Sequence, residues 1–219
     1  MNKVVSREEI INQFSDGQRI MIGGFANYGV PIKLIDLIIE SGVKDLTIIS
    51  NDTGLAGIGA SKIFDSRQGT KLVCSYIGMN PEALKLVGDM TKAGELELEL
   101  NPQGTLVERI RCGGAGLGGA LVRTGMGTMI EAGKQKIEVN GVQYLLETPL
   151  TADIALVKAW KADTYGNLVY RGTSRNYNPI VATAGKTVIV EAEEIVPAGT
   201  FEPDQVMTPG VFVNMVLAK

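Results

Sequence analysis

A glycine-rich loop near the N-terminus is the first segment of this chain with the chemistry to hold a ligand. Residues 20–22 are apolar and lie between an Asp-Gly pair and a Gly-Gly pair, which predicts a short buried strand. Pro31 then opens an apolar run with helical spacing, and Gly42 is placed to end that helix. A glycine-rich loop lets the backbone approach a ligand, and a helix N-terminus favours negative charge. The residues predicted to bind a ligand here are Gly23, Gly24, Phe25, Ala26, Asn27, Tyr28 and Gly29.

Polar turns follow two further predicted strands. Residues 45–50 are apolar and β-branched, and they end at Asn51-Asp52-Thr53-Gly54. Residues 95–100 alternate strictly between Glu and Leu, which predicts a half-buried strand with a solvated carboxylate face, and residues 101–104 then form a turn. Open α/β sheets place their ligands just beyond the carboxyl ends of strands. Asn51 and Gln103 are neutral amide donors in such turns, so each either binds a ligand or only stabilises its turn.

The residue types that are missing exclude several chemistries. The chain contains no histidine, so it cannot hold a Ser-His-Asp triad, a Cys-His dyad or a histidine metal ligand of its own. Its two cysteines, Cys74 and Cys112, are far apart and have no metal-ligand spacing. We expect Cys74 to be a buried structural thiol, and we expect no metal and no disulfide.

The composition limits which partners this protein can bind and which class of protein it belongs to. The chain has 219 residues and a net charge of −3 at pH 7, and no run of Lys or Arg that would hold nucleic acid. No apolar stretch is long enough to span a membrane, and the N-terminus has no apolar signal core. We therefore expect a soluble cytoplasmic protein, built as one domain over residues 1–219, that binds neither nucleic acid nor membrane.

The elements needed to position these residues form a regular pattern. Strand-like runs alternate with helical ones along most of the chain, which predicts an α/β fold with a mostly parallel sheet flanked by helices. Asn140-Gly141 lies between two strand-like runs, so residues 137–146 are predicted to form a β-hairpin outside the parallel sheet. A second glycine-rich segment, Gly113 to Gly119, is predicted to be a tight loop or a contact with a ligand or partner chain.

Several segments together resemble the family I coenzyme A transferases. The opening string from Asp16 to Pro31 is similar to a signature of that family, and the likeness continues over nearly the whole chain. Among its members, the chain looks like the α subunits of 3-oxoacid CoA-transferases, in particular the bacterial enzymes that act on acetate, butyrate and acetoacetate. The further segments that carry the resemblance are residues 46–52, 102–116, 155–163, 192–196 and 207–211.

The resemblance implies that this chain is half of an enzyme. The nucleophile of the family is a glutamate in a Ser-Glu-Asn-Gly segment of the β subunit, whereas this chain has no such segment. A carboxylate needs no base to attack a thioester at pH 7, which agrees with the absence of histidine. By motif, Asn51 would help to bind the thioester oxygen and Gln103 would contact the polar end of the acyl substrate. The loop from Gly23 to Gly29 would approach coenzyme A or the glutamate of the β subunit.

The implied assembly is a hetero-oligomer with the β subunit, α2β2 or larger, with coenzyme A as a substrate and no permanently bound cofactor. Three other functions remain compatible with a strand-helix chain of this kind. One is a sugar-phosphate isomerase or sugar-phosphate-binding domain, and another is the ligand-sensing domain of a transcriptional regulator. The third is a plain nucleotide-binding module, although neither G-x-G-x-x-G nor a P-loop is present.

Overall fold

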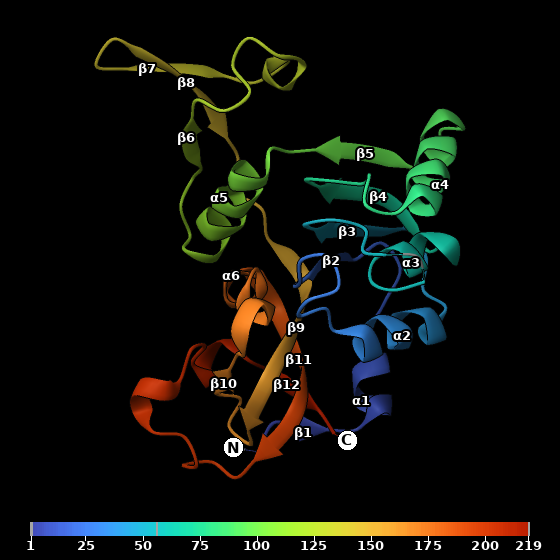
Figure 1. Cartoon of the computed structure of the whole chain (residues 1–219), viewed down its shortest axis with the longest axis vertical. Coiled ribbons are helices and arrows are strands. Elements are labelled where there is room, and N and C mark those ends of the chain that lie inside the picture. Colours follow the sequence, from blue (N-terminus) through green and yellow to red (C-terminus); the bar gives the residue numbers. More distant parts are fainter. Residues whose placement is uncertain (1, 56, 219) are drawn as a thin grey trace.

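A nine-stranded sheet forms the centre of the protein, as the computed structural model shows for residues 2–55 and 57–218 (Figure 1). Its order is β1-β12-β11-β9-β2-β3-β4-β5, all neighbours are parallel, and β10 pairs antiparallel with β9. The strands are β1 (Val4–Val5), β2 (Arg19–Ile22), β3 (Leu46–Ser50), β4 (Gly69–Cys74), β5 (Glu97–Leu100), β9 (Ala152–Asp163), β10 (Leu168–Val169), β11 (Gly185–Val196) and β12 (Met215–Leu217). The predicted α/β fold with a mostly parallel sheet is confirmed.

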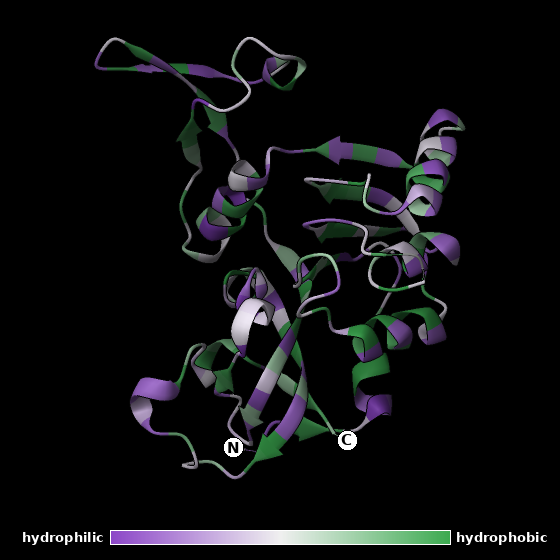
Figure 2. Cartoon of the chain, in the orientation of Figure 1, coloured by the Kyte–Doolittle hydropathy of each residue, from purple (hydrophilic) through white to green (hydrophobic). Residues whose placement is uncertain are grey.

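Helices cover both faces of this sheet. Successive residues of a strand point to opposite sides, so the apolar strands place hydrophobic side chains on both faces, and helices bury them. Ile20 and Ile22 of β2 belong to a core with helices α1 to α4, whereas Met21 belongs to a second core with α5 and α6. In Figure 2 hydrophilic and hydrophobic residues alternate along α4, as expected of a helix with one face on a core. The helices are α1 (Arg7–Ile11), α2 (Ile32–Ser41), α3 (Ser61–Asp65), α4 (Pro81–Lys92), α5 (Gln103–Gly114) and α6 (Asn178–Ala184).

The strand order reverses direction at β2. The chain runs outward from β2 through β3 and β4 to β5, then returns to place β9 on the other side of β2. Such a reversal leaves a crevice outside the carboxyl ends of the strands, where open α/β sheets bind ligands. The glycine-rich loop, Asn51 and the N-terminus of α5 all follow strands at this edge.

A small antiparallel sheet projects from the body beyond α5 (Figure 1). It consists of β6 (Ala120–Val122), β7 (Lys136–Val139) and β8 (Val142–Glu147), in the order β6-β8-β7. Asn140 and Gly141 both have positive φ, at 51° and 74°, as a two-residue hairpin turn requires. The predicted hairpin is confirmed, while β6 had no recognisable pattern in the sequence.

The second glycine-rich segment is a loop over residues 115–119, as predicted, but its first two residues are helical. Gly113 and Gly114 form the last turn of α5. A Cβ at Gly113 would lie 2.0 Å from the carbonyl oxygen of Leu150, and one at Gly114 would lie 2.2 Å from Thr183 Oγ1. These glycines therefore allow α5 to pack closely inside the chain. None of the helices in the described residues is long and apolar enough to cross a membrane.

Candidate functional site

Asn51 and Gln103 lie against each other at the carboxyl edge of the sheet. Gln103 Nε2 donates a hydrogen bond to Asn51 Oδ1 at 2.9 Å, and the Ser75 hydroxyl donates to the same oxygen at 2.8 Å. Asn51 follows β3, Ser75 follows β4, and Gln103 begins α5 after β5. The parallel register of these strands brings together two residues that are widely separated in the sequence. Their proposed roles toward a substrate stay predictions.

Asp52 organises the site and was not singled out from the sequence. Its carboxylate accepts hydrogen bonds from Asn51 Nδ2 at 2.6 Å, from the Ala26 N–H at 2.9 Å and from the Gly54 N–H at 2.8 Å. The side chain therefore joins the amide of Asn51 to the glycine-rich loop. The bond to Gly54, two residues on, forms an Asx-type turn, which the Asp-x-Gly pattern in the sequence does signal.

The loop of residues 23–29 is held tightly by the rest of the chain. Phe25 and Tyr28 exchange both backbone hydrogen bonds, at 3.0 and 2.9 Å, and form the tip. A Cβ at Gly23 would lie 2.0 Å from Asn178 Oδ1, and one at Gly29 would lie 2.7 Å from Asn178 Nδ2. These two glycines thus make room for Asn178, which was not predicted as a site residue. Binding of a ligand by the loop stays a prediction.

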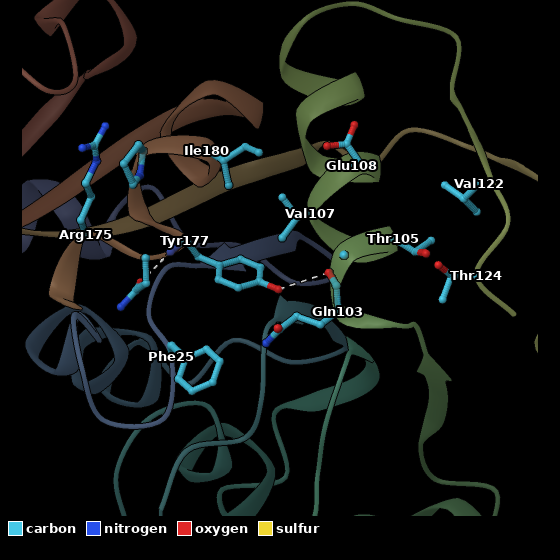
Figure 3. A pocket seen from close by; sticks show the side chains of 13 residues that line it. Phe25, Gln103, Thr105, Val107, Glu108, Val122, Thr124, Arg175, Tyr177 and Ile180 are labelled. Carbon is cyan, nitrogen blue, oxygen red and sulfur yellow. Dashed lines mark hydrogen bonds between the residues drawn. The ribbon is translucent and has the colours of Figure 1, made fainter.

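A cavity of about 760 Å³ opens beside Gln103 (Figure 3). Its wall is mostly apolar. Asn51 does not line it, since that residue is only 2% exposed, but it is hydrogen-bonded to Gln103, which does. Burial and the negative charge of Asp52 raise the pKa of Tyr177, so this phenol on the wall stays protonated. The lining residues are Phe25, Gln103, Gly104, Thr105, Val107, Glu108, Val122, Thr124, Arg175, Asn176, Tyr177, Pro179 and Ile180.

Arg109 holds the turn that precedes Gln103 through hydrogen bonds to Asn101 and Glu99. This arginine is 7% exposed and donates to Asn101 Oδ1 at 2.7 Å, to the Thr148 carbonyl at 2.8 Å and to Glu99. The solvated carboxylate face predicted for residues 95–100 is therefore wrong at Glu99, whose side chain is only 35% exposed because Arg109 of α5 binds it. Arg109 lies further along the same helix as Gln103, where sequence pattern alone gives no sign of its partners.

Both cysteines are buried in the body of the protein. Cys74 and Cys112 are free thiols, and burial raises the pKa of Cys74 to about 12, as expected of a structural thiol. No group of three or more His, Cys, Asp or Glu among residues 2–55 and 57–218 is arranged to hold a metal ion.

An apolar rim lies at the same edge of the sheet as the site. Large hydrophobic side chains follow or end each of the strands β2, β3, β4 and β5, and each is at least 40% exposed. They are Phe25, Tyr28, Leu55, Tyr76 and Leu100. Exposed apolar residues gathered around a site are typical of a surface that another protein covers.

Comparison with known proteins assigns the family. Residues 4–219 match the Coenzyme A transferase family. The acetoacetyl-CoA:acetate/butyrate CoA transferase alpha subunit of Clostridium acetobutylicum is 52% identical over 216 residues, which cover 99% of this chain and 97% of that relative. The alpha subunit of the acetate CoA-transferase of Escherichia coli is 43% identical over 215 residues, which cover 98% of this chain and 96% of that relative.

Solved structures agree in fold. An acyl-CoA transferase from Escherichia coli, in a thioester complex with CoA, superposes with a TM-score of 0.87 at 20% identity and covers 100% of this chain. This chain spans only 47% of that protein's length. Glutaconate coenzyme A-transferase from Acidaminococcus fermentans gives a TM-score of 0.83 at 19% identity, covering 98% of this chain and 75% of the other. The family match over nearly the whole chain and these close relatives place the protein in the coenzyme A transferase family.

Proposed function

We propose that this chain is the α subunit of a CoA transferase that moves coenzyme A between acetoacetyl-CoA, or another short-chain acyl-CoA, and a short acid such as acetate or butyrate. The observation that carries this proposal is the amide pair of Asn51 and Gln103 beside a largely apolar cavity. A cavity of that character suits a short acyl chain with one polar end. The name of the Clostridium relative supports the same substrates.

The nucleophile in the proposed chemistry is a glutamate of the partner β subunit. Its carboxylate attacks the thioester carbonyl, the CoA thiolate leaves, and a mixed anhydride forms. The thiolate then attacks the glutamyl carbonyl, which releases the first acid and leaves a glutamyl-CoA thioester. The second acid runs these steps in reverse, so CoA ends on that acid and the glutamate is regenerated. No net proton, electron or cofactor is consumed.

The contribution of this chain is to stabilise charge on the reacting oxygen. A tetrahedral intermediate turns the carbonyl oxygen into an oxyanion, which preorganised amide donors stabilise. Asn51 Nδ2 has two N–H groups, and Asp52 accepts one of them. We assign the other to the oxyanion, and we assign Gln103 to the polar end of the acyl group. The loop of residues 23–29 would close on CoA or on the partner's glutamate.

The apolar rim supports docking of the β subunit over the site. The amide pair lies at the edge of the sheet that also carries Phe25, Tyr28, Leu55, Tyr76 and Leu100, so a partner covering them would bring its own residues to the cavity and exclude water. We propose an α2β2 or larger assembly in which residues 1–219 act as one domain. The pairing of β1 with β12 supports that unity, because it joins two distant segments of the chain in one sheet.

The test is CoA transfer from acetoacetyl-CoA to acetate, measured with this chain by itself, with the isolated β subunit, then with both together. We expect activity only in the mixture. Glu108 is the carboxylate on the cavity wall, paired with Arg111 at 2.8 Å, and it is the internal alternative to the partner's nucleophile. Glu108→Gln should therefore keep the activity of the mixture. Activity of this chain by itself would refute the half-enzyme proposal. Loss of the mixture's activity in Glu108→Gln would refute it too.

A further inference from the structure

Asn178 anchors the glycine-rich loop of residues 23–29 to the body of the protein. Its side chain is fully buried, and its Nδ2 donates to the carbonyls of Gly29 and Ser174, at 2.9 Å each. Its Oδ1 accepts a hydrogen bond from the Lys158 N–H of β9 at 2.9 Å. One amide thus joins the end of the loop, the turn before α6 and strand β9. The loop cannot shift without breaking hydrogen bonds of a buried side chain, which is costly.

The tip of the loop is held in a conformation that its sequence does not favour. Ala26 has a φ of 52°, in the left-handed region that residues other than glycine rarely adopt. The paired backbones of Phe25 and Tyr28 enclose it, and its N–H donates to Asp52 Oδ2 at 2.9 Å. The same Asp52 oxygen accepts a hydrogen bond from Asn51 Nδ2 at 2.6 Å. One carboxylate oxygen therefore fixes the loop tip and the Asn51 amide relative to each other.

The helix that follows the loop receives a negative charge from within the chain. A glycine-rich loop that leads into a helix N-terminus is a common site for phosphate. At the N-terminus of α2, however, Glu191 Oε2 accepts a hydrogen bond from the Lys33 N–H at 2.8 Å. The other oxygen of Glu191 pairs with Lys158 Nζ at 2.8 Å, and the residue is only 5% exposed. A phosphate arriving there would meet a carboxylate that already takes the place of the anion.

We propose that the loop of residues 23–29 is a preset support for the Asn51 amide, with Asn178 as its positioning residue. The loop then serves the reacting end of the substrate, where the partner's glutamate attacks, and not the phosphates of coenzyme A. This inference rests on the function proposed above. Displacing the loop would take the Ala26 N–H away from Asp52, and Asp52 would no longer hold Asn51 in place. Asn178 is fully buried, so it acts through these contacts and not by touching substrate.

Removing the side chain of Asn178 tests this role in the complex with the β subunit. We expect Asn178→Ala to lower kcat for transfer from acetoacetyl-CoA to acetate about tenfold to a hundredfold, the scale of a misplacement of about 1 Å, while KM for the thioester is unchanged. Acetoacetyl-pantetheine, which lacks the nucleotide and all phosphates, should show the same fall. An unchanged kcat, or an effect confined to acetoacetyl-CoA, would overturn the proposal.

A second arm combines this change with Asn51→Ala. Because Asn178 acts through Asn51, Asn178→Ala should cause no further fall in kcat in a chain that already carries Asn51→Ala. A residue that only stabilises the fold would lower kcat by the same factor in both chains. That result would overturn the positioning role.

Asn176→Ala replaces Asn178→Ala if the latter does not assemble. Asn176 is less buried, and its Nδ2 donates to the carbonyl of Tyr28, in the same loop, at 2.9 Å. We expect kcat to fall about threefold to tenfold, as for loss of one hydrogen bond, and not to fall further in the chain with Asn51→Ala. An unchanged kcat in this variant would then overturn the proposal.

Asn167→Ala is the matched control. Asn167 lies in the turn between β9 and β10, and its amide binds Asp163 and the Gly210 N–H, at 2.8 Å each. Its loss should lower the thermal stability of the chain and leave kcat unchanged. An equal fall of kcat in Asn167→Ala and Asn178→Ala would overturn the positioning role. Absence of CoA transfer in the wild-type complex would instead refute the proposed function.

Discussion

The amide of Asn51 is held in one orientation by its neighbours. Its oxygen accepts hydrogen bonds from Gln103 and Ser75, and its nitrogen donates to Asp52. Rotating the amide by half a turn would set its oxygen against the Asp52 carboxylate, which only accepts hydrogen bonds, so Asp52 fixes the arrangement. An oxyanion donor needs this preorganisation, because no reorientation is then required during the reaction.

Replacing Asn51 by alanine tests that role. We expect Asn51→Ala to lower kcat by about 10²–10³, the effect of removing one oxyanion donor. Ser75→Ala is the control, because it removes a hydrogen bond to Asn51 but keeps the Nδ2 donor, and it should cost about tenfold or less. Turnover measured in the assembled complex decides the matter. Equal turnover of Asn51→Ala and wild type would remove Asn51 from the mechanism.

Gln103 is predicted to recognise the acid rather than coenzyme A. Its side chain is exposed on the cavity wall, beside the apolar surface that would hold the acyl group. Gln103→Ala should therefore lower kcat/KM for the carboxylate substrate more than it raises the KM for the CoA thioester. Steady-state kinetics with the acid and the thioester varied in turn provide the measurement. If neither parameter moves, Gln103 is only a residue of the turn.

The sequence identified Asn51 and Gln103 but not the residues that hold them. Both lie in polar turns after strands, which is a local pattern, and the family resemblance selected them from that pattern. Asp52 and Asn178 act through contacts with segments far away in the chain, such as Ala26 and Gly29. No local periodicity encodes such contacts, so they become visible only in three dimensions.

Among the elements, α5 connects the site to the projecting sheet. Gln103 at its first position reaches Asn51, and Arg109 in its middle reaches Glu99 and the carbonyl of Thr148 just after β8. Gly113 at its end packs on the backbone of Leu150. A shift of this helix would therefore move the cavity wall and the small sheet together.

Acid pH should weaken the ion pair between Glu99 of β5 and Arg109 of α5. Burial raises the pKa of Glu99, but hydrogen bonds from Arg109 and Asn101 and the charges of Arg109 and Lys71 outweigh it and hold that pKa below its usual value. A lowered pKa gives stability that is present above the unfolded-state value and is lost as pH falls through the folded-state value. Wild type should be more stable than Glu99→Gln at pH 7, and the difference should shrink below about pH 4.5.

Glu97→Gln is the control for this experiment. Glu97 pairs with Lys71 at 2.7 Å, but its side chain is 67% exposed, so the pair should contribute little to stability. Urea unfolding at several pH values measures the free energy of unfolding of each variant. A constant difference between wild type and Glu99→Gln across the acid range would contradict the role of Glu99.

Two helical glycines should respond in opposite ways to alanine. A Cβ at Gly88 in α4 would meet no atom within 4 Å, so Gly88→Ala should stabilise the fold by about 1 kcal/mol. Gly113→Ala would place its Cβ 2.0 Å from the Leu150 carbonyl oxygen and should destabilise the fold by about 1–3 kcal/mol. Thermal unfolding of both variants gives the signs. A stabilising Gly113→Ala would contradict the close packing of α5.

Local sequence patterns predicted where most helices and strands lie. They did not reveal the strands that exist only because distant segments of the chain pair with each other. The buried strands around Ile20 and Ile48 follow from residue type and spacing. β1 is only Val4–Val5, and its partner β12 is distant in the sequence, so nothing nearby marks it as a strand. β9 and β11 each run for 12 residues and pair with each other along nearly their whole length, which the local sequence does not reveal.

At the scale of the whole molecule, the site is open on one side. The cavity lies at the carboxyl edge of the sheet together with the apolar rim, and no carboxylate other than Glu108 lines it among the described residues. The family resemblance predicts that the nucleophile belongs to the partner subunit, because this chain has no Ser-Glu-Asn-Gly segment. A partner seated on the rim would complete both the wall and the chemistry.

The most direct measurement is the intact mass of each chain after the complex has been incubated with acetoacetyl-CoA without an acceptor acid. The glutamyl-CoA thioester should appear on the β subunit, where it adds the mass of CoA less one water, and it should disappear when acetate is added. This chain should keep its unmodified mass throughout. A CoA adduct on this chain, discharged by acetate, would show that the nucleophile lies within it and would contradict the half-enzyme account.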